Sequence, residues 1–263
     1  MRASKVLAKL RAGEFVRVCS LAHYIPLYIR HAAYRRYDAI WLDLEHGTLS
    51  LREVQSLLAE CHAWDIDGMV RPPTQERAYI YRYLEEGASG LMMPMVPDAA
   101  AARAIVGAAK FPPLGNRGFG GGAVRDADFT LDSGRPGSTY FADANRETFI
   151  IAQIETPAAV ANAAEIAAVE GIEALFVGPA DLGLRLAAAP PADGMTLPEA
   201  VERVASAARL HGKAWGITAG SIEELARRRA QGAQIVPRGG EYMLMQSLAA
   251  WSAELDSALR ERP

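Results

Sequence analysis

Short apolar runs of β-strand character alternate with longer helical segments along most of the chain, and this alternation restricts the fold more than any other feature. The runs are rich in aliphatic and β-branched residues and lie at 15–20, 38–44, 67–71, 89–94, 149–155, 172–178, 213–218 and 233–237. This pattern is typical of repeated βα units built around a parallel sheet.

The segments between these runs have helical periodicity, and several begin at Ser, Thr, Asp or Pro and end at Gly, as helix ends prefer. The clearest helical segments are 51–64, 74–87, 98–110, 157–170, 197–212 and 221–232. Eight βα units favour a (β/α)8 barrel over an open doubly wound sheet. We therefore expect an α/β fold with one TIM-barrel domain over residues 1–263, a length close to the roughly 250 residues that such barrels use.

One stretch interrupts the rhythm. Residues 111–147, "FPPLGNRGFGGGAVRDADFTLDSGRPGSTYFADANRE", are rich in glycine and polar side chains and come after the fourth apolar run. Long connections of this kind often carry functional groups. We therefore predict a long active-site loop at about 112–147.

Composition and net charge favour a small-molecule partner over nucleic acid or a membrane surface. Half of the residues are hydrophobic, 22% are charged and the formal net charge is −3, so nothing in the charge balance favours nucleic acid or an anionic membrane. Cys19 and Cys61 lack metal-ligand spacing and are expected to be reduced thiols. Because no apolar run approaches the ~20 residues of a membrane span and the first residues lack a signal-peptide core, we expect a cytoplasmic protein that binds small molecules.

Ionisable and polar side chains gather where the predicted strands end. The set comprises Asp43, Glu45, His46, Arg71, Gln153, Glu155 and Asp181. Chemistry in a TIM barrel sits at these carboxyl ends, because the loops that follow the strands converge there.

Glu155 and Asp181 belong to consecutive βα units, and two adjacent carboxylates repel unless a proton or cation lies between them. Hard oxygen ligands suit Mg²⁺ or Mn²⁺. The alternative is that both acids merely occupy helix starts, where carboxylates are common.

Arg71 and His46 are the other candidates for chemistry. Arg71 precedes two prolines, and a guanidinium there could hold a substrate carboxylate with two hydrogen bonds, although a structural ion pair is the alternative. His46 follows Asp43 and Glu45 closely, and its titration range suits a general base, although a packing role is also open.

Taken together, these motifs resemble the HpcH/HpaI aldolase family of class II pyruvate aldolases, such as 4-hydroxy-2-oxo-heptanedioate aldolase and 2-keto-3-deoxy-rhamnonate aldolase. The matching stretches are "WLDLEHG" (41–47), "VRPP" (70–73), "LEEGASGLMMPMV" (84–96), "FPPLGNRGFG" (111–120), "IIAQIET" (150–156), "VEGIEALFVGPADL" (169–182) and "HGKAWGI" (211–217). They occur in the family's order and cover most of the chain.

The resemblance implies a metal-dependent carbon–carbon lyase that cleaves or forms 4-hydroxy-2-oxo acids, with pyruvate held as an enolate at the metal. The metal would be Mg²⁺ or Mn²⁺, with Co²⁺ or Zn²⁺ possible, and the substrates would be a 2-oxo acid (pyruvate or oxaloacetate) and an aldehyde. It also implies a homo-oligomer, a hexamer or trimer of dimers, in which a terminal helix is exchanged between copies.

The family's site residues transfer by motif match. Glu155 and Asp181 would hold the metal, and Arg71 would sit in the pyruvate site. Gln153 would hydrogen-bond substrate or bound water, and the backbone at Gly178, Pro179 and Ala180 would help to bind the oxyanion. His46, supported by Asp43, would handle protons. No Schiff-base lysine is then needed, which agrees with the absence of lysine among the strand-end residues.

Three segments depart from the family pattern, namely 19–38, 118–146 and 236–246. The first is aromatic and apolar, the second is longer than usual, and the third reads "VPRGGEYMLMQ" where many members have "GSD". Oxaloacetate decarboxylation on the same site, citrate lyase β-subunit or malyl-CoA lyase chemistry, and a non-catalytic binding barrel are the alternative functions.

Overall fold

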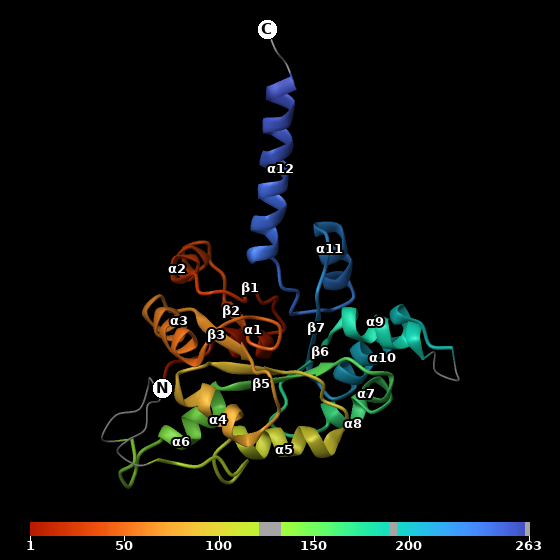
Figure 1. Ribbon diagram of the computed structural model, residues 1–263. Helices are drawn as coiled ribbons and strands as arrows, with labels where there is room; N and C mark the ends of the chain where they lie inside the picture. The colour runs from red at the N-terminus through yellow and green to blue at the C-terminus, as the bar shows by residue number, and fades with distance from the viewer. Residues whose placement is uncertain (121–132, 190–193, 261–263) are drawn as a thin grey trace.

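The computed structural model describes residues 1–120, 133–189 and 194–260, which form an α/β fold around a curled parallel sheet (Figure 1). Seven strands lie side by side in chain order. They are β1 (Val18–Leu21), β2 (Ala39–Asp43), β3 (Asp67–Arg71), β4 (Gly90–Met93), β5 (Phe149–Ile154), β6 (Ala174–Val177) and β7 (Ala214–Ile217). Each coincides with one of the first seven apolar runs of the sequence.

The eighth apolar run, 233–237, is not one of these strands. Ile235 instead makes isolated parallel bridges to Gly216 of β7 and to Val16 just before β1. The amide of Val16 donates to the carbonyl of Gln234 at 2.8 Å, and the amide of Ile217 donates to the carbonyl of Ile235 at 3.0 Å. This segment therefore contacts both outer strands of the sheet through very short pairings.

Helices separate the strands, and most of them follow the predicted segments. They are α1 (Lys5–Arg11), α2 (Pro26–Tyr34), α3 (Leu51–Ala63), α4 (Arg77–Glu85), α5 (Ala99–Ala109), α6 (Tyr140–Glu147), α7 (Pro157–Ala161), α8 (Ala163–Ala167), α9 (Pro179–Ala188), α10 (Leu197–Leu210), α11 (Ile222–Ala230) and α12 (Glu241–Arg260). Capping boxes begin α3 at Ser50 and α10 at Thr196. The single helix expected over 157–170 is divided at Asn162 into α7 and α8.

Two apolar layers cover the two faces of the sheet. The larger cluster fills the space between strands and helices and includes Ile40, Val70 and Leu175. The smaller cluster holds the alternate strand residues, among them Trp41, Met69 and Phe176. Because side chains alternate along a strand, the residues that continue the smaller cluster towards the carboxyl ends are on the inner face of the curled sheet.

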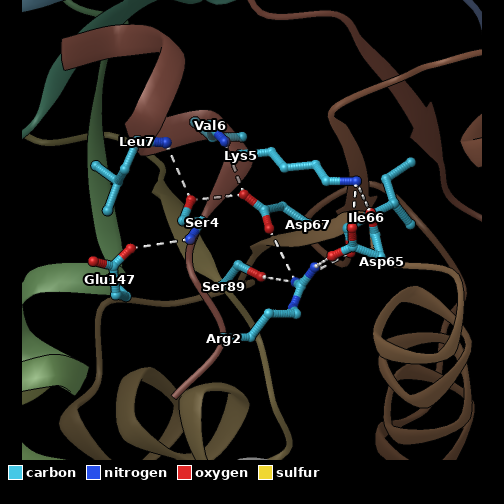
Figure 2. A network of polar contacts seen from close by, with 10 residues as sticks. All are labelled: Arg2, Ser4, Lys5, Val6, Leu7, Asp65, Ile66, Asp67, Ser89 and Glu147. Atoms are coloured by element: carbon cyan, nitrogen blue, oxygen red, sulfur yellow. Dashed lines mark hydrogen bonds and ion pairs between the residues drawn. The ribbon is translucent and has the colours of Figure 1, made fainter. Parts of the chain in front are cut away.

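A polar network closes the opposite, amino-terminal end of the strands (Figure 2). Asp67, the first residue of β3, is buried and accepts hydrogen bonds from Ser4 Oγ at 2.6 Å, the amide of Val6 at 2.9 Å and Arg2 Nη2 at 2.9 Å. Burial raises the pKa of Asp67, and the hydrogen bonds from Ser4 and Val6 oppose that rise. The segment before α1 is thus anchored under the sheet, away from the strand ends where the candidate site lies.

The segment predicted as an active-site loop, at about 112–147, follows α5 and includes α6 at its end. A short connection, 94–98, joins β4 directly to α5, and the long segment begins only after α5. Its described ends meet before β5, where the amide of Phe111 donates to Asn145 Oδ1 at 2.7 Å. The segment therefore starts after α5 and returns to the chain at the amino-terminal end of β5. Residues 121–132 lie outside the described residues.

The last helix, α12, stands clear of the rest of the chain (Figure 1). None of its residues is buried. Across the described residues, no helix combines the length and the apolar character that crossing a membrane requires.

Candidate active site

Arg71 and Asp43 form the best-defined polar pair at the carboxyl ends of the strands. They are register partners at the last positions of β3 and β2. Arg71 donates from Nε to Asp43 Oδ1 at 2.9 Å and from Nη2 to Asp43 Oδ2 at 2.5 Å. Glu45 Oε2 lies 3.1 Å from Arg71 Nη1, and the Trp41 ring centroid lies 4.9 Å from the guanidinium carbon. The Arg71 side chain is therefore fixed on three sides while further N–H groups on Nη1 and Nη2 can face a ligand.

Glu155 follows β5 and is the most deeply buried carboxylate of the group, with 2% of the residue exposed. Its Oε1 accepts a hydrogen bond from Gln153 Nε2 at 2.8 Å, and its Oε2 accepts one from the amide of Met95 at 2.9 Å. A side chain on Gly178 would place a Cβ 2.4 Å from Glu155 Oε1, so glycine is required there for the carboxylate to cross the end of β6.

Burial is the main cause of a raised pKa at Glu155. The hydrogen bond from Met95 lowers that pKa, the negative charges of Glu45 and Asp181 raise it, and the positive charge of Arg71 lowers it.

Met95 contributes its backbone amide to the site, a role that the sequence did not predict. Its φ of 54° is in the left-handed region, which is uncommon for residues other than glycine. Gln75 Nε2 donates to the carbonyls of Pro94 at 2.6 Å and Met95 at 3.0 Å, which holds this turn in place. The turn after β4 thereby directs the Met95 N–H to Glu155. In the sequence, Pro94 and Pro97 indicate a turn here but not the direction of this N–H.

Asp181 lies in the first turn of α9, whose start is formed by Gly178, Pro179 and Ala180. Its Oδ1 is 2.6 Å from Arg185 Nη1, one helical turn later. The same Arg185 atom lies 3.5 Å from the backbone carbonyl of Glu155. The end of β5 and the start of α9 are thus joined at the point where the two acids were predicted to meet.

His46 is at the exposed rim of the cluster. Its side chain is 63% exposed, and its Nε2 lies 3.9 Å from Glu45 Oε2. Asp43 contacts the backbone at this position instead of the imidazole, because Asp43 Oδ1 accepts hydrogen bonds from the amides of Glu45 at 3.1 Å and His46 at 3.3 Å. Asp43 therefore shapes the loop that carries His46 while its carboxylate is bound to Arg71.

The donor set fits a divalent cation held by few protein ligands. The cluster contains four carboxylates and two guanidinium groups, so its fully ionised form is doubly negative; these are Asp43, Glu45, Glu155, Asp181, Arg71 and Arg185. Gln153 Oε1 is buried and has no hydrogen-bond partner within the described residues. No three His, Cys, Asp or Glu side chains in that part of the chain are grouped as a complete metal site. Two carboxylates with water and substrate oxygens match the coordination of Mg²⁺-type ions.

Comparison with known proteins identifies the family. The sequence model of the HpcH/HpaI aldolase/citrate lyase family matches residues 18–247. The chain belongs to this family. It is 35% identical over 215 residues to a hydroxypyruvate/pyruvate aldolase of Delftia acidovorans, covering 81% of this chain and 77% of that protein. It is 42% identical over 176 residues to a 4-hydroxy-2-oxovalerate aldolase of Novosphingobium aromaticivorans, covering 66% and 64%.

A solved structure gives the same result. An HpcH/HpaI aldolase from Desulfitobacterium hafniense superposes with a TM-score of 0.85 at 31% identity, and the match covers 99% of this chain and 98% of that one. Because the family comprises aldolases and lyases and the similar proteins are named aldolases, the protein is a carbon–carbon lyase of the HpcH/HpaI type.

Proposed function

We propose that the protein is a metal-dependent aldolase that cleaves or forms 4-hydroxy-2-oxo acids by way of pyruvate. The observation that carries this proposal is that the buried Glu155 after β5 and Asp181 at the start of α9 lie at the end of the sheet that also holds the fixed guanidinium of Arg71, where Arg185 contacts both Asp181 and the backbone of Glu155. Mg²⁺ or Mn²⁺ suits these ligands best, and Co²⁺ or Zn²⁺ would also fit. We also infer that segment 233–237 completes an eight-stranded barrel, because Ile235 bridges Gly216 of β7 on one side and Val16, just before β1, on the other.

Each residue has a distinct task in this proposal. A divalent cation held by Glu155 and Asp181 would supply Lewis-acid stabilisation of the negative charge that develops on pyruvate when the carbon–carbon bond breaks. Arg71 would bind the pyruvate carboxylate through its remaining N–H groups, and Asp43 and Glu45 would keep its plane fixed.

The groups around this pair would complete the site. Gln153 Oε1, buried and without a partner in the described residues, would accept a hydrogen bond from water or substrate. The start of α9, at Gly178, Pro179 and Ala180, is a region of positive potential suited to an oxyanion. The amide of Ala180 would serve it, because Pro179 has no N–H and the amide of Gly178 donates to the carbonyl of Ile154 at 3.1 Å. His46, exposed at the rim, would exchange protons with the substrate hydroxyl through water.

The four lysines support a mechanism without a Schiff base. Lys5 and Lys9 are in α1, Lys213 immediately precedes β7, and Lys110 follows α5. Lys110 Nζ donates to the backbone carbonyl of Thr148, the residue before β5. Its amine is therefore at the opposite end of β5 from Glu155, outside the proposed site.

We further propose that α12 packs against a second copy of the chain. Its exposed apolar residues recur at helical spacing, namely Leu244, Leu248, Trp251, Leu255 and Leu259. An uncovered apolar row of this length is unfavourable in water, and an equivalent helix from another protomer would bury it. A homo-oligomer, a hexamer or trimer of dimers, is the assembly we expect.

Mn²⁺ titration of matched variants tests the proposed site. We expect Glu155→Gln and Asp181→Asn to lose Mn²⁺ binding in calorimetry while circular dichroism stays native, because each removes one of two anionic ligands. Glu254→Gln, which removes an exposed charge from α12, is the control and should bind like wild type. Unchanged Mn²⁺ affinity in both site variants would reject the assignment. Comparing pyruvate release from oxaloacetate and from 4-hydroxy-2-oxo acids then separates decarboxylation from aldol cleavage.

A further inference from the structure

Glu241, the first residue of α12, is attached to the catalytic end of the sheet. Its Oε1 accepts hydrogen bonds from the amides of Ala22 at 2.7 Å and His23 at 2.8 Å, both in the loop after β1. The Glu241 side chain is only 15% exposed, although none of the residues of α12 is buried. The helix therefore makes one anchored contact with the body of the chain at its start.

The loop after β1 is in turn bound to the loop after β2. The carbonyl of Ala22 accepts a hydrogen bond from the amide of Thr48 at 3.1 Å. Gly47 is packed so closely between these loops that a Cβ there would lie 2.9 Å from the Ala22 carbonyl oxygen and 2.1 Å from that of Asp43. A displacement of residues 22–23 must therefore be transmitted to residues 44–48.

Residues 44–48 hold the groups that fix Arg71. Glu45 lies against Arg71 Nη1, and the amides of Glu45 and His46 donate to the same Asp43 oxygen that accepts from Arg71 Nε. Hydrogen bonds, together with the short stretch of backbone from Thr48 to Glu45, thus connect the start of α12 with Arg71 across the ends of β1, β2 and β3. Glu155 and Asp181 are on the other side of the site, at β5 and α9.

The backbone before Glu241 is held against β1, because the amide of Ser20 donates to the carbonyl of Gly239 at 3.2 Å and the amide of Arg238 donates to the carbonyl of Val18 at 2.8 Å. Gly239 and Gly240 have φ values of 108° and 133°, which favour glycine, and a Cβ on Gly240 would lie 2.6 Å from the Ser20 carbonyl oxygen. No residue of α12 is buried, so a second copy that covers its apolar row would act on the body of the chain through this fixed backbone and through Glu241.

We propose that Glu241 is a positioning residue that couples the seating of α12 to the orientation of Arg71, so that assembly of the protein sets its affinity for 2-oxo acids. This inference rests on the proposed function for the role of Arg71, whereas the coupling itself rests on the hydrogen bonds. Glu241 acts through the two loops and touches no reacting group.

The test compares Glu241→Ala with Glu254→Ala, a charge removal from the same helix without a loop contact, in the full-length assembled protein. Pyruvate affinity is measured by calorimetry in the presence of Mn²⁺, Mn²⁺ affinity is measured separately, and amide exchange is followed by mass spectrometry. For Glu241→Ala we expect a dissociation constant for pyruvate about tenfold higher, because a charge-assisted hydrogen-bond pair is lost. Mn²⁺ affinity should stay unchanged, and exchange should increase at both 22–23 and 44–48.

Glu241→Gln should give a smaller change in the same direction, because its amide oxygen still accepts from both backbone amides, and it replaces the alanine variant if that variant fails to fold. A general loss of stability would weaken pyruvate and Mn²⁺ binding together, and this result would overturn the proposal. Faster exchange confined to residues 22–23, with unchanged pyruvate affinity, would overturn it as well. If wild type binds Mn²⁺ but no pyruvate, the proposed function fails, whereas the exchange at 44–48 still decides the coupling.

Discussion

Lys110 allows a quantitative test of how burial acts on an ionisable group in this fold. Only 1% of the residue is exposed, and its Nζ contacts the Asn145 carbonyl at 2.8 Å and both the carbonyl and, at 3.2 Å, the hydroxyl of Thr148. Burial lowers the pKa of Lys110 from 10.5 to about 8, partly opposed by the charge of Glu173. The difference between these values corresponds to about 3 kcal/mol, since one pH unit is worth about 1.4 kcal/mol.

The sign follows from proton binding. Between pH 8 and 10.5 the unfolded chain keeps the lysine proton that the folded protein has lost, so the unfolded state binds more protons. The free energy of unfolding therefore increases, because of Lys110, as the pH rises from 8 to 10.5. Below pH 8 this stabilising contribution is absent. Cysteine and tyrosine titrations also affect stability there, so the comparison must be made between wild type and Lys110→Met, which share them.

Urea unfolding followed by circular dichroism at pH 7.5, 9 and 10 provides the measurement. We expect the stability of wild type relative to Lys110→Met to increase with pH, approaching about 3 kcal/mol in total. Parallel stability profiles would show that the carbonyl contacts keep the amine protonated and would refute the reasoning. An amine with a lowered pKa is also what a Schiff-base aldolase requires, so we expect borohydride with pyruvate to leave Lys110 unmodified because it is at the wrong end of β5.

Three further outcomes follow from the site and from α12. Gly178→Ala should weaken Mn²⁺ binding in calorimetry, because its Cβ would lie 2.4 Å from Glu155 Oε1; wild-type affinity would show that the carboxylate moves freely. Arg71→Ala should raise the dissociation constant for pyruvate about 10- to 100-fold, because a charged hydrogen bond of about 1.5–3 kcal/mol is lost. An unchanged dissociation constant would show that Arg71 has only a structural role. Leu248→Glu should lower the mass measured by light scattering, whereas an unchanged mass would place the interface elsewhere.

Hydrophobic periodicity was sufficient to predict seven of the strands, because each is a short apolar run between helix-start and helix-end signals. The run at 233–237 has the same composition, but within the described residues Ile235 is its only member that forms a β-bridge. Pro237 has no N–H to donate to a neighbouring strand, and Gly216 brings its backbone close enough to Ile235 that a Cβ would be 2.3 Å from the Ile235 carbonyl oxygen. Composition does not report such local geometry.

The partner of Asp43 shows what sequence reasoning omitted. Proximity along the chain made Asp43 and Glu45 candidates to orient the imidazole of His46. In the structure the Asp43 carboxylate binds Arg71 on the adjacent strand, and Glu45 Oε2 lies 3.9 Å from His46 Nε2. The sequence does contain a signal for this pair. Asp43 and Arg71 end neighbouring strands, and each comes two residues after an inward-facing apolar residue, Trp41 or Met69, so both side chains point inward. Arg185 was equally accessible as the i+4 neighbour of Asp181. The role of the Met95 N–H could not be predicted from the sequence. Every residue except proline has a backbone N–H, and only the geometry of the turn directs this one to Glu155.

The distribution of positive charge explains why Glu155 needs a further partner. Arg71 directs Nε and Nη2 to Asp43 and Nη1 to Glu45, and its charge lowers the pKa of Glu155 by less than burial raises it. Arg185 is paired with Asp181. Two neutral donors, Gln153 and the Met95 amide, are the only hydrogen bonds to Glu155 side-chain oxygens within the described residues, and burial still raises its pKa. A buried carboxylate in this position is stabilised either by a proton or by a cation. The charge of Asp181 also raises the pKa of Glu155. A divalent cation would compensate both carboxylates at once, which a single proton does not, and this is the physical argument for the metal site that we propose.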